Sequence, residues 1–149
     1  RTVLSLMLSG ALETYPRIRF ILAHAGGFVP YVAHRLLLAT LREEPKIKLA
    51  GMLVNRKRAV AQRMQVFKRF WYDTALSSTP AAFPSLLAVA DPSRIMFGSD
   101  FPFAPAPAVK FMRAEYEDLP LPGDLRAGID RRNAEALFPR LAAAAPPKP

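Results

Sequence analysis

The sequence contains no cysteine and only two histidines, so the chemistry open to it is narrow. Without cysteine the chain has no disulfide, no thiolate nucleophile and no thiolate metal ligand. A cysteine-free chain fits a reducing compartment, which predicts a cytoplasmic location. Long apolar runs are also missing. None approaches the roughly 20 residues of a membrane helix, so we expect no membrane partner.

Acidic residues are scarce relative to basic ones, and 12 against 21 give a formal net charge of +9. The basic residues gather at residues 42–48, 56–58 and 68–69. Such clusters indicate either a solvated helix face or a surface that attracts anions. The second interpretation leaves a non-catalytic basic binding module as an alternative function. No helix-turn-helix, zinc-finger or RRM signature accompanies the clusters, so nucleic acid is not an expected partner.

Short apolar runs, each followed by sequence of helical periodicity, determine the predicted fold. The runs at residues 18–23, 70–74 and 95–97 are typical of strands in a parallel sheet. Helical spacing predicts helices over residues 3–15, 30–41, 56–67, 80–90, 108–116 and 122–137. One helix followed by three strand–helix units predicts an α/β fold with three parallel strands. We expect residues 1–140 to form one domain and the Ala/Pro-rich residues 141–149 to form a loose tail.

A histidine and a carboxylate follow two of the predicted strands. His24 precedes Gly26-Gly27, which allow a tight turn beside the imidazole, and Asp100 follows the bend at Gly98-Ser99. Barrels of the α/β class display catalytic groups at the carboxyl ends of their strands. His24 and Asp100 are therefore the candidate catalytic pair. Asp73 also ends a strand, where capping, a salt bridge or catalysis would each account for it.

Side-chain alternation adds a prediction about direction. It places His24 on the face of Leu22 and Asp100 on the face of Met96. Because both side chains end strands of one sheet, we expect them to converge on the same side of it, close enough to flank one metal ion or water.

Short motifs spread from residue 15 to about residue 138 carry a family resemblance. In chain order they are Tyr15-Pro16-Arg17-Ile18-Arg19-Phe20, Ala23-His24-Ala25-Gly26-Gly27-Phe28-Val29-Pro30-Tyr31, Arg35-Leu36, Phe70-Trp71-Tyr72-Asp73-Thr74-Ala75, Phe97-Gly98-Ser99-Asp100-Phe101-Pro102 and Asn133-Ala134. The His-Ala-Gly-Gly and Gly-Ser-Asp-Phe-Pro motifs, in this order and at this distance, are specific together. On these motifs the chain resembles the C-terminal half of the amidohydrolase-related family. That family includes the aminocarboxymuconate-semialdehyde and methylsalicylate-type decarboxylases.

The resemblance implies a (β/α)8 barrel of the TIM type, in which the three strands are the sixth, seventh and eighth. It implies that His24 acts beside a divalent metal, expected to be zinc, as acid/base or as a ligand. It also implies that Asp100 is a metal ligand that handles a proton. The family's other ligands are a His-x-His on the first strand and a histidine after the fifth strand. They have no counterpart here, since the only other histidine is His34, in a predicted helix. Two protein groups do not complete a catalytic zinc site, which takes three.

The activity that the resemblance implies is decarboxylation of a small aromatic or muconate-type carboxylic acid, a carbon–carbon lyase reaction. A hydrolase of the same family, opening a lactone or an amide, would use the same ligands, and the sequence does not separate the two. Gly27 stands where some salicylate-type relatives carry a glutamate, which favours the muconate-type pattern. Arg35 matches an arginine that reaches a neighbouring subunit's substrate in dimeric decarboxylases. It is the candidate substrate-binding residue, with a solvated helix arginine as the alternative.

The first residue bears on assembly. The chain begins with Arg1 rather than Met and shows no signal-peptide pattern, which predicts a fragment or a processed product. Three strands of an eight-strand barrel leave open edges. We therefore expect the chain either to form a homo-oligomer or to associate with a missing N-terminal half. An inactive fragment is the remaining alternative.

Overall fold

Three short strands form one parallel sheet at the centre of the molecule. The computed structural model describes residues 1–40, 50–51 and 53–143. Within them the strands are β1 (Ile21–Leu22), β2 (Trp71–Asp73) and β3 (Ile95–Met96), in the order β1-β2-β3. Both neighbouring pairs are parallel, as the sequence predicts. The strands are shorter than the apolar runs, although Phe20 and Thr74, just outside them, still bond to the neighbouring strands.

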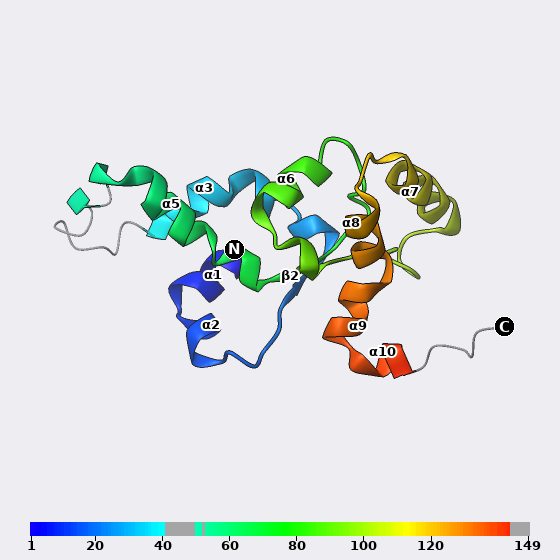
Figure 1. Ribbon diagram of the computed structural model, residues 1–149, viewed down its shortest axis with the longest axis horizontal. Coiled ribbons are helices and arrows are strands. Elements are labelled where there is room, and N and C mark those ends of the chain that lie inside the picture. The colour runs from blue at the N-terminus through cyan, green and yellow to red at the C-terminus, as the bar shows by residue number, and fades with distance from the viewer. Residues whose placement is uncertain (41–49, 52, 144–149) are drawn as a thin grey trace.

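Helices flank the sheet on both sides along the chain. Figure 1 shows α1, α2, α3 and α5 to one side of β2 and α7 to α10 to the other. The helices are α1 (Thr2–Leu8), α2 (Ala11–Thr14), α3 (Val29–Thr40), α5 (Arg56–Met64), α6 (Phe83–Val89), α7 (Ala106–Asp118), α8 (Gly123–Ala127), α9 (Asn133–Leu137) and α10 (Pro139–Ala143). In the described part of the chain, no helix has the length and apolar character that crossing a membrane requires.

Two of the predicted helices differ in detail from the structure. The single helix predicted over residues 3–15 is wrong, because Gly10 takes a left-handed conformation (φ 68°) and separates α1 from α2. The helix predicted over residues 122–137 is present as α8, a π-helical turn η5 (Gly128–Arg132) and α9 in succession. The predicted tail begins inside α10 at Leu141, and residues 144–149 lie outside the described residues.

The register of the sheet separates its two faces. Leu22 and Ile95 pair with Tyr72 and share its face, where Tyr72 and Ile95 are fully buried in the core beneath the helices. Ile21 and Trp71 pair on the other face. Ile21 is 42% exposed there, so this face is the less covered one. In a closed barrel it corresponds to the interior.

The outer edge of β3 is occupied by the C-terminal helical segment. The buried side chain of Asn133 donates through Nδ2 to the carbonyl oxygens of Pro92 (2.9 Å) and Ile95 (2.7 Å). The backbone N–H of Phe97 donates to the carbonyl oxygen of Ile129 at 2.8 Å. Because Ile129 lies in the π-helical turn, where the regular i→i−4 ladder is interrupted, its carbonyl can accept this bond. The segment therefore fixes β3 just before Asp100.

Burial of Tyr72 makes the stability of the fold sensitive to alkaline pH. Its phenol donates to the carbonyl oxygen of Phe67 at 2.8 Å, and burial raises the pKa of Tyr72 above its ordinary value near 10. Above about pH 10 the folded state therefore holds a proton that the unfolded state loses. We expect the free energy of unfolding to be constant with respect to this group below about pH 10 and to fall at higher pH.

Urea titrations between pH 8 and 11 measure this dependence. The Tyr72→Phe variant should lose about 1 kcal/mol at pH 8 with the hydrogen bond, and its stability should then fall less steeply above pH 10. Tyr15→Phe, at an exposed tyrosine, is the control and should keep the wild-type slope. Equal slopes for the wild type and Tyr72→Phe would contradict the prediction.

Candidate functional site

The three loops that follow the strands carry strained backbone. Among the described residues, the non-glycine residues with positive φ are His24 (56°), Ala25 (55°), Leu76 (53°) and Asp100 (57°). The first two follow β1, Leu76 follows β2 and Asp100 follows β3. Such conformations cost on the order of 1–3 kcal/mol each and gather at functional sites. The strain therefore marks the carboxyl edge of the sheet as the candidate site.

His24 is held from both its backbone and its ring. It opens the 3-10 turn η1 (His24–Gly26) directly after β1. Its backbone N–H donates to Oδ1 of Asp73 at 2.9 Å. Its ring nitrogen Nδ1 lies 3.1 Å from the carbonyl oxygen of Ala75. Both partners belong to the end of β2 and the residues just after it, so the neighbouring strand fixes the position of the half-buried imidazole.

The contact with Ala75 determines the tautomer of His24. A carbonyl oxygen can only accept, so Nδ1 carries the proton in this hydrogen bond. In the neutral ring Nε2 is then the basic nitrogen with its lone pair open. A backbone carbonyl behind Nδ1 is also the usual support of a histidine that ligates a metal through Nε2. His24 can therefore act as a base or as a ligand.

Asp73 organises the middle of this edge. Its Oδ1 accepts from the backbone N–H of Ala75 (3.0 Å) as well as from that of His24. Gly98 lies directly against it, because a Cβ at Gly98 would stand 3.0 Å from the Asp73 Cβ. The carboxylate thus joins the loops after β1 and β2, and a side chain in place of Gly98 would crowd it at the end of β3. Of the roles left open for Asp73, capping is the one these contacts support.

Asp100 follows β3 at the same end of the sheet as His24. Its half-buried carboxylate makes no hydrogen bond or ion pair with the described residues, which leaves it available to a ligand. The alternation of side chains along a strand does not predict the direction of the Asp100 side chain. Leu22 and Met96 lie on opposite faces of the sheet, and both His24 and Asp100 have left the extended conformation. The two side chains belong to one sheet edge, and their convergence stays a prediction.

The donors fit a divalent metal in type but not in number. An imidazole nitrogen and a carboxylate are ordinary ligands of Zn²⁺ and of Mn²⁺. However, no group of three or more His, Cys, Asp or Glu side chains able to hold a metal exists within residues 1–40, 50–51 and 53–143. The described residues therefore do not form a complete metal centre on their own.

The remaining candidates among the described residues lie on helices rather than in the loops that follow the strands. Arg35 is exposed on α3, and within the described part of the chain it makes no hydrogen bond or ion pair with His24 or Asp100. His34 is exposed on the same helix, as expected of a surface residue. Of the basic clusters, residues 56–58 are exposed on α5, which fits a solvated helix face. The cluster at residues 42–48 lies outside the described residues.

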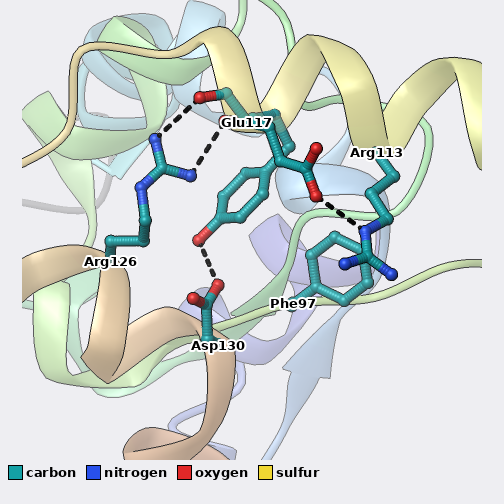
Figure 2. A pocket seen from close by; sticks show the side chains of 6 residues that line it. Phe97, Arg113, Glu117, Arg126 and Asp130 are labelled. Carbon is teal, nitrogen blue, oxygen red and sulfur yellow. Dashed lines mark hydrogen bonds and ion pairs between the residues drawn. The ribbon is translucent and has the colours of Figure 1, made fainter.

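A hollow of about 480 Å³ lies between α7 and η5 (Figure 2). Its side chains hold these elements together and leave no open ligand site. The Tyr116 phenol donates to Oδ1 of Asp130 at 2.6 Å, and Arg113 pairs with Glu117 at 2.8 Å. Arg126 donates to three carbonyl oxygens at the end of α7, those of Tyr116, Glu117 and Leu119. Each charged group in the hollow thus has a partner within it.

The contacts between α7 and η5 also support the residues between β3 and Asp100. The ring of Phe97 packs on that of Tyr116 with centroids 5.3 Å apart. Burial, followed by the hydrogen bond to Asp130, raises the pKa of Tyr116, so the phenol stays a donor in neutral and mildly alkaline solution. The periodicity of the sequence indicates two helices here but not this contact, because Asp130 bonds across the turn between them.

Comparisons of sequence identify relatives along most of the chain. The profile of the family described as Amidohydrolase matches residues 1–140. The 6-methylsalicylic acid decarboxylase of Penicillium expansum is 36% identical over 141 residues, covering 95% of this chain and 41% of that protein. The 6-methylsalicylic acid decarboxylase of Aspergillus aculeatus is 37% identical over 146 residues, covering 95% and 42%. The chain therefore spans about two fifths of the length of these curated relatives.

Solved structures share the fold. A dihydroxybenzoic acid decarboxylase from Polaromonas sp., with bound manganese and the inhibitor 2-nitroresorcinol, matches with a TM-score of 0.69 at 24% identity, covering 92% of this chain and 38% of that one. The 5-carboxyvanillate decarboxylase from Sphingomonas paucimobilis matches with a TM-score of 0.62 at 26% identity, covering 91% and 38%. Because these neighbours are amidohydrolase barrels, the three-stranded sheet is part of the TIM-type architecture that the sequence predicts.

Substitution of Asp73 tests its structural role. Asp73→Ala removes the acceptor of two backbone N–H groups, so we expect a loss of about 2 kcal/mol in the free energy of unfolding. Asp73→Asn keeps a side-chain oxygen that can accept both bonds, and it should lose markedly less. Urea denaturation of the two variants measures the difference. Equal stability of both variants and the wild type would show that the carboxylate does not fix the edge.

Proposed function

Because the chain belongs to the amidohydrolase family, we propose that it forms the C-terminal part of a decarboxylase barrel that depends on a divalent metal and acts on a small aromatic carboxylic acid. The observation that carries the proposal is the hydrogen bond from Nδ1 of His24 to Ala75, which leaves Nε2 open at the edge of the sheet. Decarboxylation is favoured over hydrolysis because the curated relatives named above are decarboxylases.

The relatives also favour an aromatic substrate over a muconate-type one. Two of them are named for 6-methylsalicylic acid, and the solved neighbours are named for dihydroxybenzoic acid and 5-carboxyvanillate. The absence of a glutamate at Gly27, which favours the muconate-type pattern in the sequence, carries less weight than these names. We propose a salicylate-like acid, with a hydroxyl or methyl group beside the carboxylate.

The chain's own residues supply the proton chemistry. Loss of CO2 leaves a carbanion-like carbon that must be protonated. His24, once Nε2 has taken up a proton, or Asp100, in its carboxylic acid form, can deliver that proton, and both side chains are half-buried. Asp73 is assigned to positioning instead, because its Oδ1 accepts two backbone N–H groups and thereby orients His24.

A divalent metal, when bound, would polarise the substrate carboxylate and a bound water. Of His24 and Asp100, the residue that does not deliver the proton would be a metal ligand, and the remaining ligands must come from outside the described residues. The sequence predicts zinc. The manganese in the Polaromonas neighbour supports a divalent ion without favouring zinc, so we propose the ion class and not its identity.

The test of this proposal uses variants that keep the strained backbone. Asparagine tolerates positive φ better than alanine, so His24→Asn and Asp100→Asn change the chemistry with little effect on the turns. We expect each to lower the rate of CO2 release from 6-methylsalicylate by at least ~100-fold. Asp100→Asn should also lower the content of bound divalent metal. Since the chain spans two fifths of its relatives, the assay includes the remaining part of the Penicillium expansum relative as a separate polypeptide.

The matched control is Asp73→Asn, which preserves an acceptor for the His24 backbone and should retain most of the activity. Metal analysis and steady-state kinetics on the three variants decide the matter. Near-normal rates for both His24→Asn and Asp100→Asn would remove the catalytic assignment.

We further propose that β1 is the edge at which the chain associates, with itself or with other barrel strands. The outer edge of β3 is already bonded by Asn133 and Ile129, whereas Ile21 on β1 is 42% exposed. In such a homo-oligomer Arg35, exposed on α3, would reach a neighbouring subunit's substrate carboxylate. This role rests on the family resemblance alone.

Sedimentation velocity tests the association. The wild-type chain should form dimers or larger species as its concentration rises. Ile21→Lys should shift it toward monomer, because a lysine on an edge strand opposes strand pairing. A monomeric wild type at high concentration, or an unchanged distribution for Ile21→Lys, would contradict the assignment of this edge.

A further inference from the structure

An arginine stands at the start of each of the three strands. Arg19 and Arg69 each precede their strand by two residues, and Arg94 comes directly before β3. All three line one pocket of about 350 Å³ at the edge where the strands begin, the opposite edge from His24 and Asp100. Since the strands are parallel and adjacent, this common position gathers the three cations.

The guanidinium groups are held mainly by backbone carbonyl oxygens. Arg94 lies over the ring of Trp71, 5.7 Å from its centroid, and donates to the carbonyl oxygen of Arg69 at 2.7 Å. Arg69 donates to the carbonyl oxygen of Leu12 and to the carboxylate of Glu13. Arg19 donates to the carbonyl oxygen of Leu137 at 3.2 Å. Each guanidinium has five N–H donors, so most of these donors remain available.

The positive charge of this pocket is only partly balanced. The three arginines carry three positive charges, and Glu13 is the one carboxylate that pairs with them among the described residues. Asp91 is nearby but does not line the pocket, and it is bound by the N–H and hydroxyl of Ser93. Burial acts to raise the pKa of Asp91, yet these bonds and the charges of Arg94 and Lys68 hold it below its usual value. About two positive charges therefore remain.

We propose that this pocket binds a small dianionic oxyanion of the phosphate class. Guanidinium forks match the oxygen spacing of phosphate and form charge-assisted hydrogen bonds with it. Leu12, Ile18 and Phe20 form apolar walls beside the arginines. The arginines come from three separate strand starts, so the fold itself positions the donors. Binding here needs neither the metal nor the catalytic role proposed for His24 and Asp100.

Trp71 provides a direct signal, because it is the only tryptophan in the chain and lines the pocket under Arg94. The experiment titrates inorganic phosphate into the purified chain while tryptophan fluorescence is recorded, with sodium chloride holding the ionic strength constant. We expect a saturable change. A parallel titration with phenyl phosphate tests whether the ligand is an organic phosphate or the free phosphate ion. Tighter binding than that of inorganic phosphate assigns the site to an organic phosphate, and weaker binding assigns it to the free ion.

Three variants test whether phosphate affinity depends on the arginines of the pocket or only on the net positive charge of the chain. Arg19→Gln removes one fork at an exposed position, and it should raise the Kd for phosphate about tenfold. Arg94→Lys keeps the charge but loses the fork and the stacking on Trp71, and it should also weaken binding. Lys110→Gln removes one exposed charge on α7, outside the pocket, and should leave the Kd unchanged.

The proposal is overturned if the wild type shows no change beyond that of chloride. It is also overturned if Arg19→Gln binds as tightly as the wild type, or if Lys110→Gln weakens binding as much as Arg19→Gln does. Far-UV circular dichroism checks the fold of each variant. If Arg94→Lys does not fold, the comparison of Arg19→Gln with Lys110→Gln decides alone.

Discussion

One carboxylate oxygen, Oδ1 of Asp73, is the interaction on which the rest of the candidate site depends. It accepts the backbone N–H of His24 at 2.9 Å and that of Ala75 at 3.0 Å. The first bond fixes the turn after β1, and the second fixes the carbonyl-bearing residue that holds the His24 ring. Because the strained turn at His24 costs free energy, it persists only where such contacts determine it. A single acceptor on the central strand thus orients a side chain of the neighbouring one.

The sheet carries different groups at the ends of its strands and at their starts. At the strand ends, the backbone is strained, and an imidazole nitrogen and a carboxylate are left open. At the strand starts, Arg19, Arg69 and Arg94 gather positive charge around a small pocket. The π-helical turn supports the first edge from outside, since Ile129 and Asn133 bond β3 just before it reaches Asp100.

Much of the fold follows from the sequence, and less of the site does. Apolar runs separated by helical spacing predict three parallel strands, because such strands need crossover helices and burial on both faces. The break at Gly10 is not visible in that pattern, since glycine is tolerated inside helices as well as at their ends. Motifs mark His24 and Asp100, but strand alternation does not determine where their side chains point. It assumes extended backbone, whereas both residues have positive φ; at His24 this conformation depends on contacts across the sheet that no local pattern reveals. The capping role of Asp73 is likewise a long-range contact.

The measurement that tests the central claim most directly is the tautomer of His24, observed through its ring nitrogens in the ¹⁵N NMR spectrum at a pH where the imidazole is neutral. The claim is that Ala75 holds the proton on Nδ1 and leaves Nε2 open. The exposed His34 is the internal reference for a ring without this restraint. The account predicts a single Nδ1–H form for His24. A His24 ring protonated on Nε2, or one that averages between tautomers as an unrestrained histidine does, would contradict it.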